Sequence, residues 1–275
     1  MSWVFITVGA GNKQFEEAAR RLAAQARRSH LFSKTLSIDT KLLLELVPDL
    51  QERLKTATGE ETPGFGFYSW KSRIAKMAID GCFGSFEGIV LVDAGCEFFL
   101  SARSQKILFK YQVVAKNQGV GAFQISTPEC RLTKRSLFQY FPSLSPDDSS
   151  AQFQSGILLI DIRRGREIVE AWDRLVWENV KNVNDALDTE REDFYAHRHD
   201  QSVLSLVLKD FGVKALRPNP PGMVLGLSNS VKANSFPIWW SRNRTGLTRI
   251  PGYLQIFGNF TYFVSRLFLV RSAQK

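Results

Sequence analysis

The chain has 275 residues, of which 44% are hydrophobic and 12% aromatic, so it can bury a large core. Charged residues make up 23%, an ordinary share for globular proteins, which excludes a disordered or fibrous protein. Lys and Arg number 36 against 27 Asp and Glu, and the net charge of +9 favours an anionic partner such as phosphate groups or an acidic membrane surface. No helix-turn-helix, zinc-finger or RNA-binding signature accompanies the basic residues, so nucleic acid is not expected as a partner.

The N-terminal residues and the cysteines indicate a reducing compartment. Residues 1–8 lack the basic head and the small-residue cleavage site of a secretory signal, and Trp3–Val8 is typical of a first β-strand. Cys82, Cys96 and Cys130 form no closely spaced pair and are odd in number, so neither a disulfide framework nor a zinc site is expected. We therefore expect a cytoplasmic protein.

Short apolar runs alternate with amphipathic segments, which is the pattern of βαβ units and a largely parallel sheet. Trp3–Val8 is apolar throughout, as is typical of a strand that is covered on both faces, and Gly9 ends it. A helix with an alanine-rich apolar stripe follows over residues 15–26. Further strands are predicted at Gly88–Val92, Gly121–Ile125 and Gly156–Ile160, and helix faces over residues 107–114 and 168–183.

The last third of the chain contains a short apolar helix and several breaks. Asp200 opens this helix and Gly212 ends it. A further short strand is predicted at Val213–Leu216. Two polar, loop-like stretches lack the character of domain boundaries: residues 143–150 and 190–199.

We therefore predict one α/β domain with a mostly parallel central sheet and flanking helices over residues 1–250, followed by an amphipathic helix over residues 251–275. Within Tyr253–Val270, polar residues recur at helical spacing on one side, and large apolar residues cover much of the rest. Arg266 and several polar residues argue against a membrane span. Two alternatives remain for this helix: it lies on an anionic membrane surface, or it covers the core of its own domain.

The strongest predicted strand ends in a carboxylate. Asp93 follows Gly88–Val92 and precedes Gly95, which allows a close approach of the backbone. In open α/β sheets, ligands bind beyond the carboxyl ends of the strands, so Asp93 could hold a divalent cation or a ribose hydroxyl. It could equally satisfy the backbone N–H groups of a turn.

Several motifs occur in the order found in one family of enzymes. Val92–Gly95 resembles the DxD region of GT-A-type glycosyltransferases, with Gly95 in the place of the second Asp. Gly64–Lys71 is similar to a G-x-G-Y-x-x-W-K segment of bacterial nucleotide-sugar transferases. The resemblance extends over residues 3–245. Three further matches follow in order: Thr133–Lys134 at a helix start, Gln154–Gly156 where many of these enzymes carry Asn-x-Gly, and Asp200–Gln201 where they carry an Asp-Gln pair.

The resemblance implies a GT-A-like, Rossmann-type fold that binds a nucleotide-diphospho-sugar donor and transfers its sugar to a glycan or lipid-linked acceptor. Glycosyl transfer passes through an oxocarbenium-like state, so it needs carboxylate or amide groups at the anomeric carbon and positive charge at the leaving diphosphate. The catalytic and acceptor side is assigned to Asp200, Gln201 and Gln154. The donor side is assigned to Asp93, Gly95, Lys71, Lys134, Arg242 and Arg244.

The altered DxD region leaves the role of a metal open. Mn²⁺ or Mg²⁺ offsets the diphosphate charge in DxD enzymes, and Gly95 removes one of the usual ligands here, so Asp93 is left with Glu97 as a substitute partner. Alternatively, the His197–His199 segment completes the ligand shell, or the basic residues around Arg242 replace the ion. The two histidines could also be merely exposed.

Each of these residues also has a purely structural interpretation: Asp200 as a helix N-cap, the cations as solvated surface residues, and Trp239–Trp240, which could stack on a sugar or base, as packing. Two other functions stay open: a non-catalytic basic protein that docks on anionic membranes or polyanions, and a nucleotidyltransferase of related fold. The clustering of Asp93, Gln154 and Asp200 at strand ends or helix starts favours an enzyme. We expect a hexosyl or related transferase of polysaccharide biosynthesis, in the cytoplasm or on the inner face of the membrane.

Overall fold

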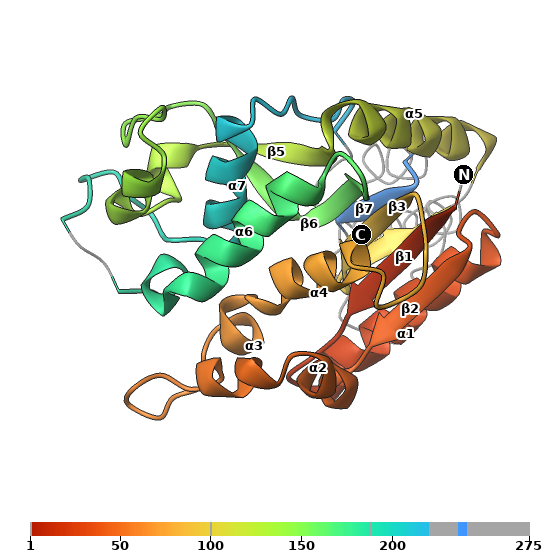
Figure 1. Ribbon diagram of the computed structural model, residues 1–275, viewed down its shortest axis with the longest axis horizontal. Coiled ribbons are helices and arrows are strands. Elements are labelled where there is room, and N and C mark those ends of the chain that lie inside the picture. Colours follow the sequence, from red (N-terminus) through yellow and green to blue (C-terminus); the bar gives the residue numbers. More distant parts are fainter. Residues whose placement is uncertain (1, 100, 187–188, 220–235, 241–275) are drawn as a thin grey trace, which may run out of the picture.

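Helices cover both faces of a central five-stranded sheet in the computed structural model, which describes residues 2–99, 101–186, 189–219 and 236–240 (Figure 1). The strand order is β2-β1-β3-β6-β5, and a second sheet pairs β4 with β7. The predicted α/β class, a central sheet with flanking helices, is confirmed. The strands are β1 (Trp3–Val8), β2 (Lys34–Ile38), β3 (Gly88–Asp93), β4 (Cys96–Phe98), β5 (Val120–Pro128), β6 (Ala151–Asp161) and β7 (Ile238–Trp240).

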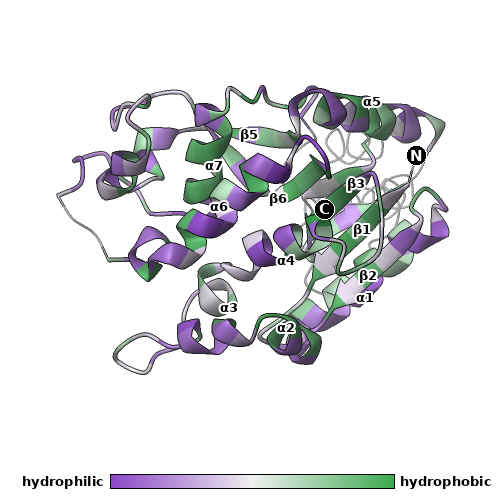
Figure 2. Ribbon diagram, viewed as in Figure 1, coloured by the Kyte–Doolittle hydropathy of each residue, from purple (hydrophilic) through white to green (hydrophobic). Residues whose placement is uncertain are grey.

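The helices divide between the two faces of the sheet because alternate side chains of a strand point to opposite sides. In β1, Val4 and Ile6 pack with α4, α6 and α7, whereas Trp3 and Phe5 pack with α1 and α5. All six residues of β1 are buried, and the central strands are accordingly hydrophobic along their length (Figure 2). The α-helices are α1 (Lys13–Arg28), α2 (Thr40–Leu46), α3 (Gly64–Phe67), α4 (Trp70–Ile79), α5 (Ala102–Gln118), α6 (Arg166–Glu178) and α7 (Asp200–Asp210). Short 3₁₀ helices are η1 (Pro48–Arg53), η2 (Glu129–Arg131), η3 (Arg135–Tyr140) and η4 (Val180–Asn182).

One strand of the sheet runs against the others. Strands β2, β1 and β3 are mutually parallel, but β6 is antiparallel to both of its neighbours, β3 and β5. The expected mostly parallel sheet is therefore a mixed sheet with one reversed strand. Because β6 is reversed, its first residues, and not its last, lie at the carboxyl end of β3.

The pairing of β5 with β6 is irregular near this edge. Ala122 pairs with Leu158 and Gln124 pairs with Phe153, so a two-residue step on β5 lies opposite a five-residue step on β6. Such bulges break the ladder locally and turn side chains away from the regular alternation. Residues 154–157 of β6 therefore lack regular partners on β5, whereas Ile157 still pairs with Val92 near the end of β3.

Most of the predicted strands and the start of α7 at Asp200 are confirmed, although β5 and β6 are longer than predicted. Val213–Leu216 forms no strand, but the Leu216 N–H donates to the carbonyl of Ala122 over 2.8 Å and so holds this segment to the sheet. The predicted C-terminal helix over residues 251–275 lies outside the described residues. Within the part of the chain that the structure describes, no helix is long and apolar enough to cross a membrane.

Candidate active site

The short element α3 is a left-handed turn before α4 and not a regular α-helix. Gly64, Phe65, Gly66, Phe67 and Tyr68 all have positive φ, between 56° and 88°. L-residues avoid this region because Cβ approaches the following carbonyl oxygen, which costs about 1–2 kcal/mol per residue. Backbone strain of this kind persists only where the surrounding structure enforces it, and it is frequent at functional sites.

The two glycines of this turn are enforced by close packing. A Cβ on Gly64 would lie 2.2 Å from the Tyr68 ring, and a Cβ on Gly66 would lie 2.6 Å from the Leu50 side chain. The Gly66 N–H donates to Thr62 Oγ1 over 3.0 Å. The Trp70 indole N–H donates to the Gly64 carbonyl over 3.1 Å, which ties the turn to the first residue of α4. The turn therefore fixes the start of the helix that carries Lys71.

The side chain of Lys71 is buried and pairs with the end of the strongest strand. Its Nζ lies 2.8 Å from Asp93 Oδ1 and donates to Ser155 Oγ over 3.2 Å. The rings of Tyr68 and Trp70 face the same ammonium, with centroids at 5.0 and 5.7 Å. Two separate motifs of the sequence thus meet in one ion pair.

The other carboxylate oxygen of Asp93 faces the irregular part of β6. A Cβ on Gly156 would lie 3.0 Å from both Asp93 Oδ2 and Trp240 Nε1, so any larger residue would press against these two side chains. The Asp93 side chain remains 41% exposed, although Lys71 beneath it is only 4% exposed. Asp93 therefore offers an accessible carboxylate above a buried cation.

Asp200 completes the cluster from the first turn of α7. The residue is 2% exposed, and its Oδ2 has no hydrogen-bond partner among the described residues. Burial, first of all, raises the pKa of Asp200 to about 7; the ammonium of Lys71 opposes this rise and the carboxylate of Asp93 adds to it. The N-cap position belongs to His199, which has a positive φ of 52°, so Asp200 is not the N-cap of α7.

The charges of the cluster are coupled through Lys71. Burial alone would lower the pKa of its ammonium, but the carboxylate of Asp93, and after it that of Asp200, outweigh burial and raise this pKa. Lys71 therefore stays protonated at neutral pH. Asp200 changes its protonation near neutrality, which is the range in which a general acid or base is most effective.

The structure thus brings Lys71, Asp93 and Asp200 together, and it adds Ser155, which sequence reasoning missed although Gln154 and Gly156 on either side were noted. The side chain of Gln154 is half-buried on the irregular stretch of β6. Gln201 turns to another contact: its amide donates to Gln152 Oε1 over 2.6 Å. Gly95 lies two residues beyond Asp93, between β3 and β4.

Lys134, which directly precedes η3, binds the segment of residues 181–186. The residue is 1% exposed, and its ammonium donates to the backbone carbonyls of Lys181, Asn184 and Ala186. These three carbonyls belong to the segment that follows α6. The geometry therefore ties Lys134 to this segment, whereas Lys71 is the lysine that contacts Asp93.

Glu97 and Asp93 do not form a common ligand shell. Glu97 is buried with its carboxylate 3.6 Å from the guanidinium of Arg21, and it accepts a hydrogen bond from the Gln25 amide. Asp93 Oδ1 is bound to Lys71. The described residues contain no group of three His, Cys, Asp or Glu side chains that could hold a metal ion. The proposed pair of ligands therefore does not fit a metal, and no step of the chemistry below is assigned to one.

The two histidines before α7 bind backbone carbonyls. A ring nitrogen of His197 pairs with the carbonyl of Asn182 at 2.9 Å, and one of His199 pairs with that of Val183 at 2.8 Å. Burial, followed by the charge of Lys134, lowers the pKa of His197 to about 3, so this imidazole stays neutral. Both histidines thus hold the loop before α7 in place.

Arg242 and Arg244 lie outside the described residues. The side chain of Trp240 reaches the cluster at Gly156 and packs edge-on against Phe123, with ring centroids 5.5 Å apart. Trp240, one of the two tryptophans noted in the sequence, therefore lies beside Asp93.

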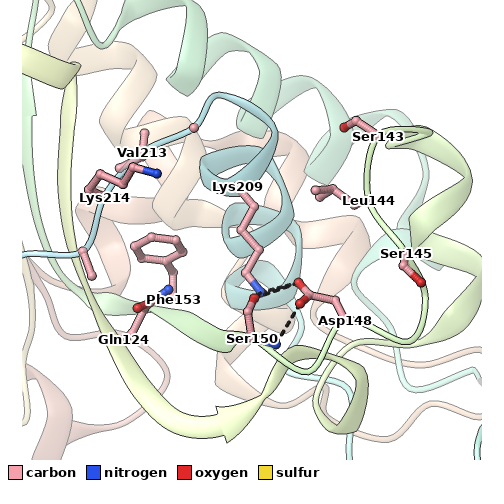
Figure 3. A pocket seen from close by; sticks show the side chains of 12 residues that line it. Gln124, Ser143, Leu144, Ser145, Asp148, Ser150, Phe153, Lys209, Val213 and Lys214 are labelled. Atoms are coloured by element: carbon pink, nitrogen blue, oxygen red, sulfur yellow. Dashed lines mark hydrogen bonds and ion pairs between the residues drawn. The ribbon is translucent and has the colours of Figure 1, made fainter.

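A hollow of about 500 Å³ lies at the other end of α7 (Figure 3). Lys209 points into it and donates to Asp148 and Ser150, each over 2.7 Å, and it also lies 2.9 Å from Glu129. Nine residues of helix, roughly 13 Å, separate Lys209 from Asp200. Lys209 is thus held by two carboxylates, Glu129 and Asp148, at the end of α7 remote from the cluster of Lys71, Asp93 and Asp200.

No protein-family model matches the sequence, and no curated protein does. Among solved structures, the chain is similar to mouse xyloside xylosyltransferase 1 in its apo form, at 11% identity and a TM-score of 0.48, over 90% of this chain and 100% of that one. It is also similar to a glycosyltransferase involved in glycosylation of the major capsid of PBCV-1, at 10% identity and 0.46, over 87% and 93%. A third similar structure is the galactosyltransferase LgtC with donor and acceptor sugar analogs, at 12% identity and 0.45, over 92% and 85%. By name, all three are glycosyltransferases.

Proposed function

We propose that the chain is a glycosyltransferase that moves a sugar from a nucleotide-diphospho-sugar to an acceptor hydroxyl. The observation that carries this proposal is the cluster of Lys71, Asp93 and Asp200 at the carboxyl edge of the sheet. These residues come from three of the motifs that resemble GT-A enzymes, and they meet where ligands bind in open α/β folds.

The chemistry of glycosyl transfer suits these side chains. Positive charge must build up at the anomeric carbon while negative charge moves to the leaving diphosphate. Lys71 supplies a cation that burial and two carboxylates hold in one position. Asp93, with its exposed side chain, faces the donor and binds a ribose hydroxyl.

Asp200 is the group suited to proton transfer. Its Oδ2 is buried without a hydrogen-bond partner among the described residues, so it is available to accept a proton from the acceptor hydroxyl. Its pKa of about 7 allows it to be ionised in part of the molecules before the reaction and to hold a proton afterwards. Ser155 orients this carboxylate and also accepts from Lys71.

The finer points of the reaction extend this proposal. The transferred group is a hexosyl or related sugar, and the acceptor is a glycan or a lipid-linked glycan of polysaccharide biosynthesis. The net charge of +9 supports an anionic donor and a site of action beside an anionic membrane surface. Gln154 is next to Ser155 on β6, and Gln201 is next to Asp200 on α7. We assign these two amides to the acceptor side.

The experiment is a screen of nucleotide-sugars for release of the nucleoside diphosphate, with and without simple glycan acceptors. Asp93→Asn is compared with Asp161→Asn, a matched change at the opposite edge of the sheet, where Asp161 pairs with Gly88. We expect Asp93→Asn to lower turnover on the order of a hundredfold and Asp161→Asn to leave it unchanged. Equal turnover in both variants, or release of pyrophosphate from a nucleoside triphosphate, contradicts the proposal, and the second result indicates a nucleotidyltransferase.

A further inference from the structure

Helix α5 carries a basic sequence with no acidic residue. Its 17 residues include four Lys or Arg and neither Asp nor Glu. One cation, Lys116, is paired with Glu87 at 2.6 Å. The described residues offer no ion-pair partner to the other three basic side chains, which are Arg103, Lys106 and Lys110.

The outer face of α5 also exposes two large apolar side chains. Phe109 is 49% exposed and Val113 is 37% exposed, although the opposite face of the helix buries Leu108 and Tyr111 against the sheet. Residues three and four positions apart in a helix are neighbours on its surface. Phe109 therefore lies among Lys106, Lys110 and Val113, and Arg103 extends the same face. We call these five residues the α5 face.

The basic character continues beyond the end of the helix. The Arg164 guanidinium donates to the carbonyl of Asn117 over 3.0 Å, and Arg163 beside it is exposed. These two arginines add positive charge next to the C-terminal end of α5. The α5 face and these two arginines therefore surround the Phe109 ring with positive charge, which is complementary to an anionic surface.

We propose that the α5 face docks on an anionic lipid bilayer, with Phe109 and Val113 entering the headgroup region and Arg103, Lys106 and Lys110 contacting lipid phosphates. A bilayer explains both halves of the pattern. Basic side chains are stabilised near anionic headgroups, and exposed apolar side chains are stabilised by transfer out of water. A nucleic acid would use the cations but offers no apolar medium for Val113. This inference does not depend on the proposed reaction.

The test is co-sedimentation of the full chain with vesicles of phosphatidylcholine alone or mixed in equal parts with phosphatidylglycerol. Wild type is expected to bind the mixed vesicles, and less so as salt is raised. Lys106→Glu/Lys110→Glu is expected to lower the partition coefficient at least about tenfold. Lys41→Glu/Lys55→Glu makes the same change of net charge at exposed lysines elsewhere and is expected to keep wild-type binding.

A second variant separates the apolar from the electrostatic contribution. Phe109→Ser/Val113→Ser keeps every charge, and because both side chains are partly exposed, the fold should be retained with only a modest fall in melting temperature. It is expected to weaken vesicle binding, and a fluorescence-labelled RNA is expected to bind this variant as it binds wild type. Unchanged vesicle binding in either α5 variant overturns the proposal. A loss of RNA binding that is larger than the loss of vesicle binding also overturns it and indicates nucleic acid as the partner.

Discussion

Lys71 Nζ lies 2.8 Å from Asp93 Oδ1, and this contact joins the first turn of α4 to the last residue of β3. The ammonium is almost fully buried, whereas the carboxylate is 41% exposed. This pair joins a cation that cannot move to an anion that solvent and ligands can reach. The carboxylate of Asp200 acts electrostatically on the same ammonium and helps to raise its pKa. Removal of any one member should therefore alter the other two.

Replacement of Asp200 tests the proton-transfer role. Asp200→Asn keeps the shape of the side chain but cannot take up a proton, so turnover should fall on the order of a hundredfold or more. The melting temperature should stay the same or rise, because a buried carboxylate becomes a neutral amide. Asp210→Asn, at the exposed end of the same helix, is the control. Wild-type turnover in the Asp200 variant would exclude the catalytic role.

The raised pKa of Asp200 predicts a specific pH dependence of stability. The folded chain holds this proton up to about pH 7, whereas the unfolded chain releases it near the ordinary value of 3.8, so the free energy of unfolding falls as the pH rises between these values. The Asp200→Asn variant has no titrating group at this position, so this fall in the free energy of unfolding is absent from it. The gain in melting temperature of the variant over wild type should thus be larger at about pH 8 than at about pH 5. A gain that is equal at both values would contradict the shifted pKa.

Removal of the central cation should cost stability as well as activity. Lys71→Met leaves Asp93 and Asp200 without their shared partner, and we expect the free energy of unfolding to fall by about 1–3 kcal/mol in urea titrations. Because Asp93 is partly hydrated, the loss should stay below that of a fully buried ion pair. The double variant Lys71→Met/Asp93→Asn should recover part of the stability but none of the activity. Additive losses in the double variant would show that the two residues are not coupled.

A comparison of alanine variants at two glycines with similar φ distinguishes backbone strain from the effect of packing. Gly66 has φ of 88° and Gly59 has φ of 86°, but only at Gly66 would a Cβ meet another side chain, Leu50 at 2.6 Å. We expect Gly59→Ala to cost about 1 kcal/mol of unfolding free energy and Gly66→Ala about 2–4 kcal/mol. Gly66→Ala should also lower turnover, since the turn fixes the start of α4. Equal effects of the two changes would refute the enforced left-handed turn.

Glu97→Gln distinguishes a structural carboxylate from a metal ligand. The variant removes the charge that faces the buried Arg21, so unfolding should become easier by about 1–3 kcal/mol. Donor affinity, measured by calorimetry with and without chelator, should match wild type in both conditions. If the variant lost affinity only when Mg²⁺ or Mn²⁺ was present, Glu97 would be a ligand after all.

The sequence predicted secondary structure best where a run of apolar residues is explained by burial alone. Continuous apolar runs predicted β1 and β3, because a strand covered on both faces has no polar alternation. Such runs carry no direction, so the reversal of β6 could not be predicted. The short strands β2 and β4 were missed because three to five residues of mixed polarity give no clear period, and β7 was missed because three apolar residues are too few to show one.

Candidate site residues could be predicted from motifs, but their contacts with distant segments could not. Lys71, Asp93 and Asp200 were recognised from motifs, and the edge of the sheet brings them together. Lys134 also came from a motif, but its environment depends on the carbonyls of a distant loop, which no local pattern records. Ser155 has no distinctive pattern at all, since its contact with Lys71 depends on the irregular stretch of β6.

The position of the reversed strand also bears on how the chain is synthesised. β6 lies between β3 and β5, so β5 has no neighbour in the sheet until residues 151–161 have left the ribosome. Until then β3 is an edge strand whose backbone N–H and C=O groups can pair with another chain. In the folded chain β1, β2 and β3 are mutually parallel, and the free edge of β3 is the one that β6 later covers. The interval between residues 93 and 161 is therefore the stage of translation at which nascent chains most need shielding from one another.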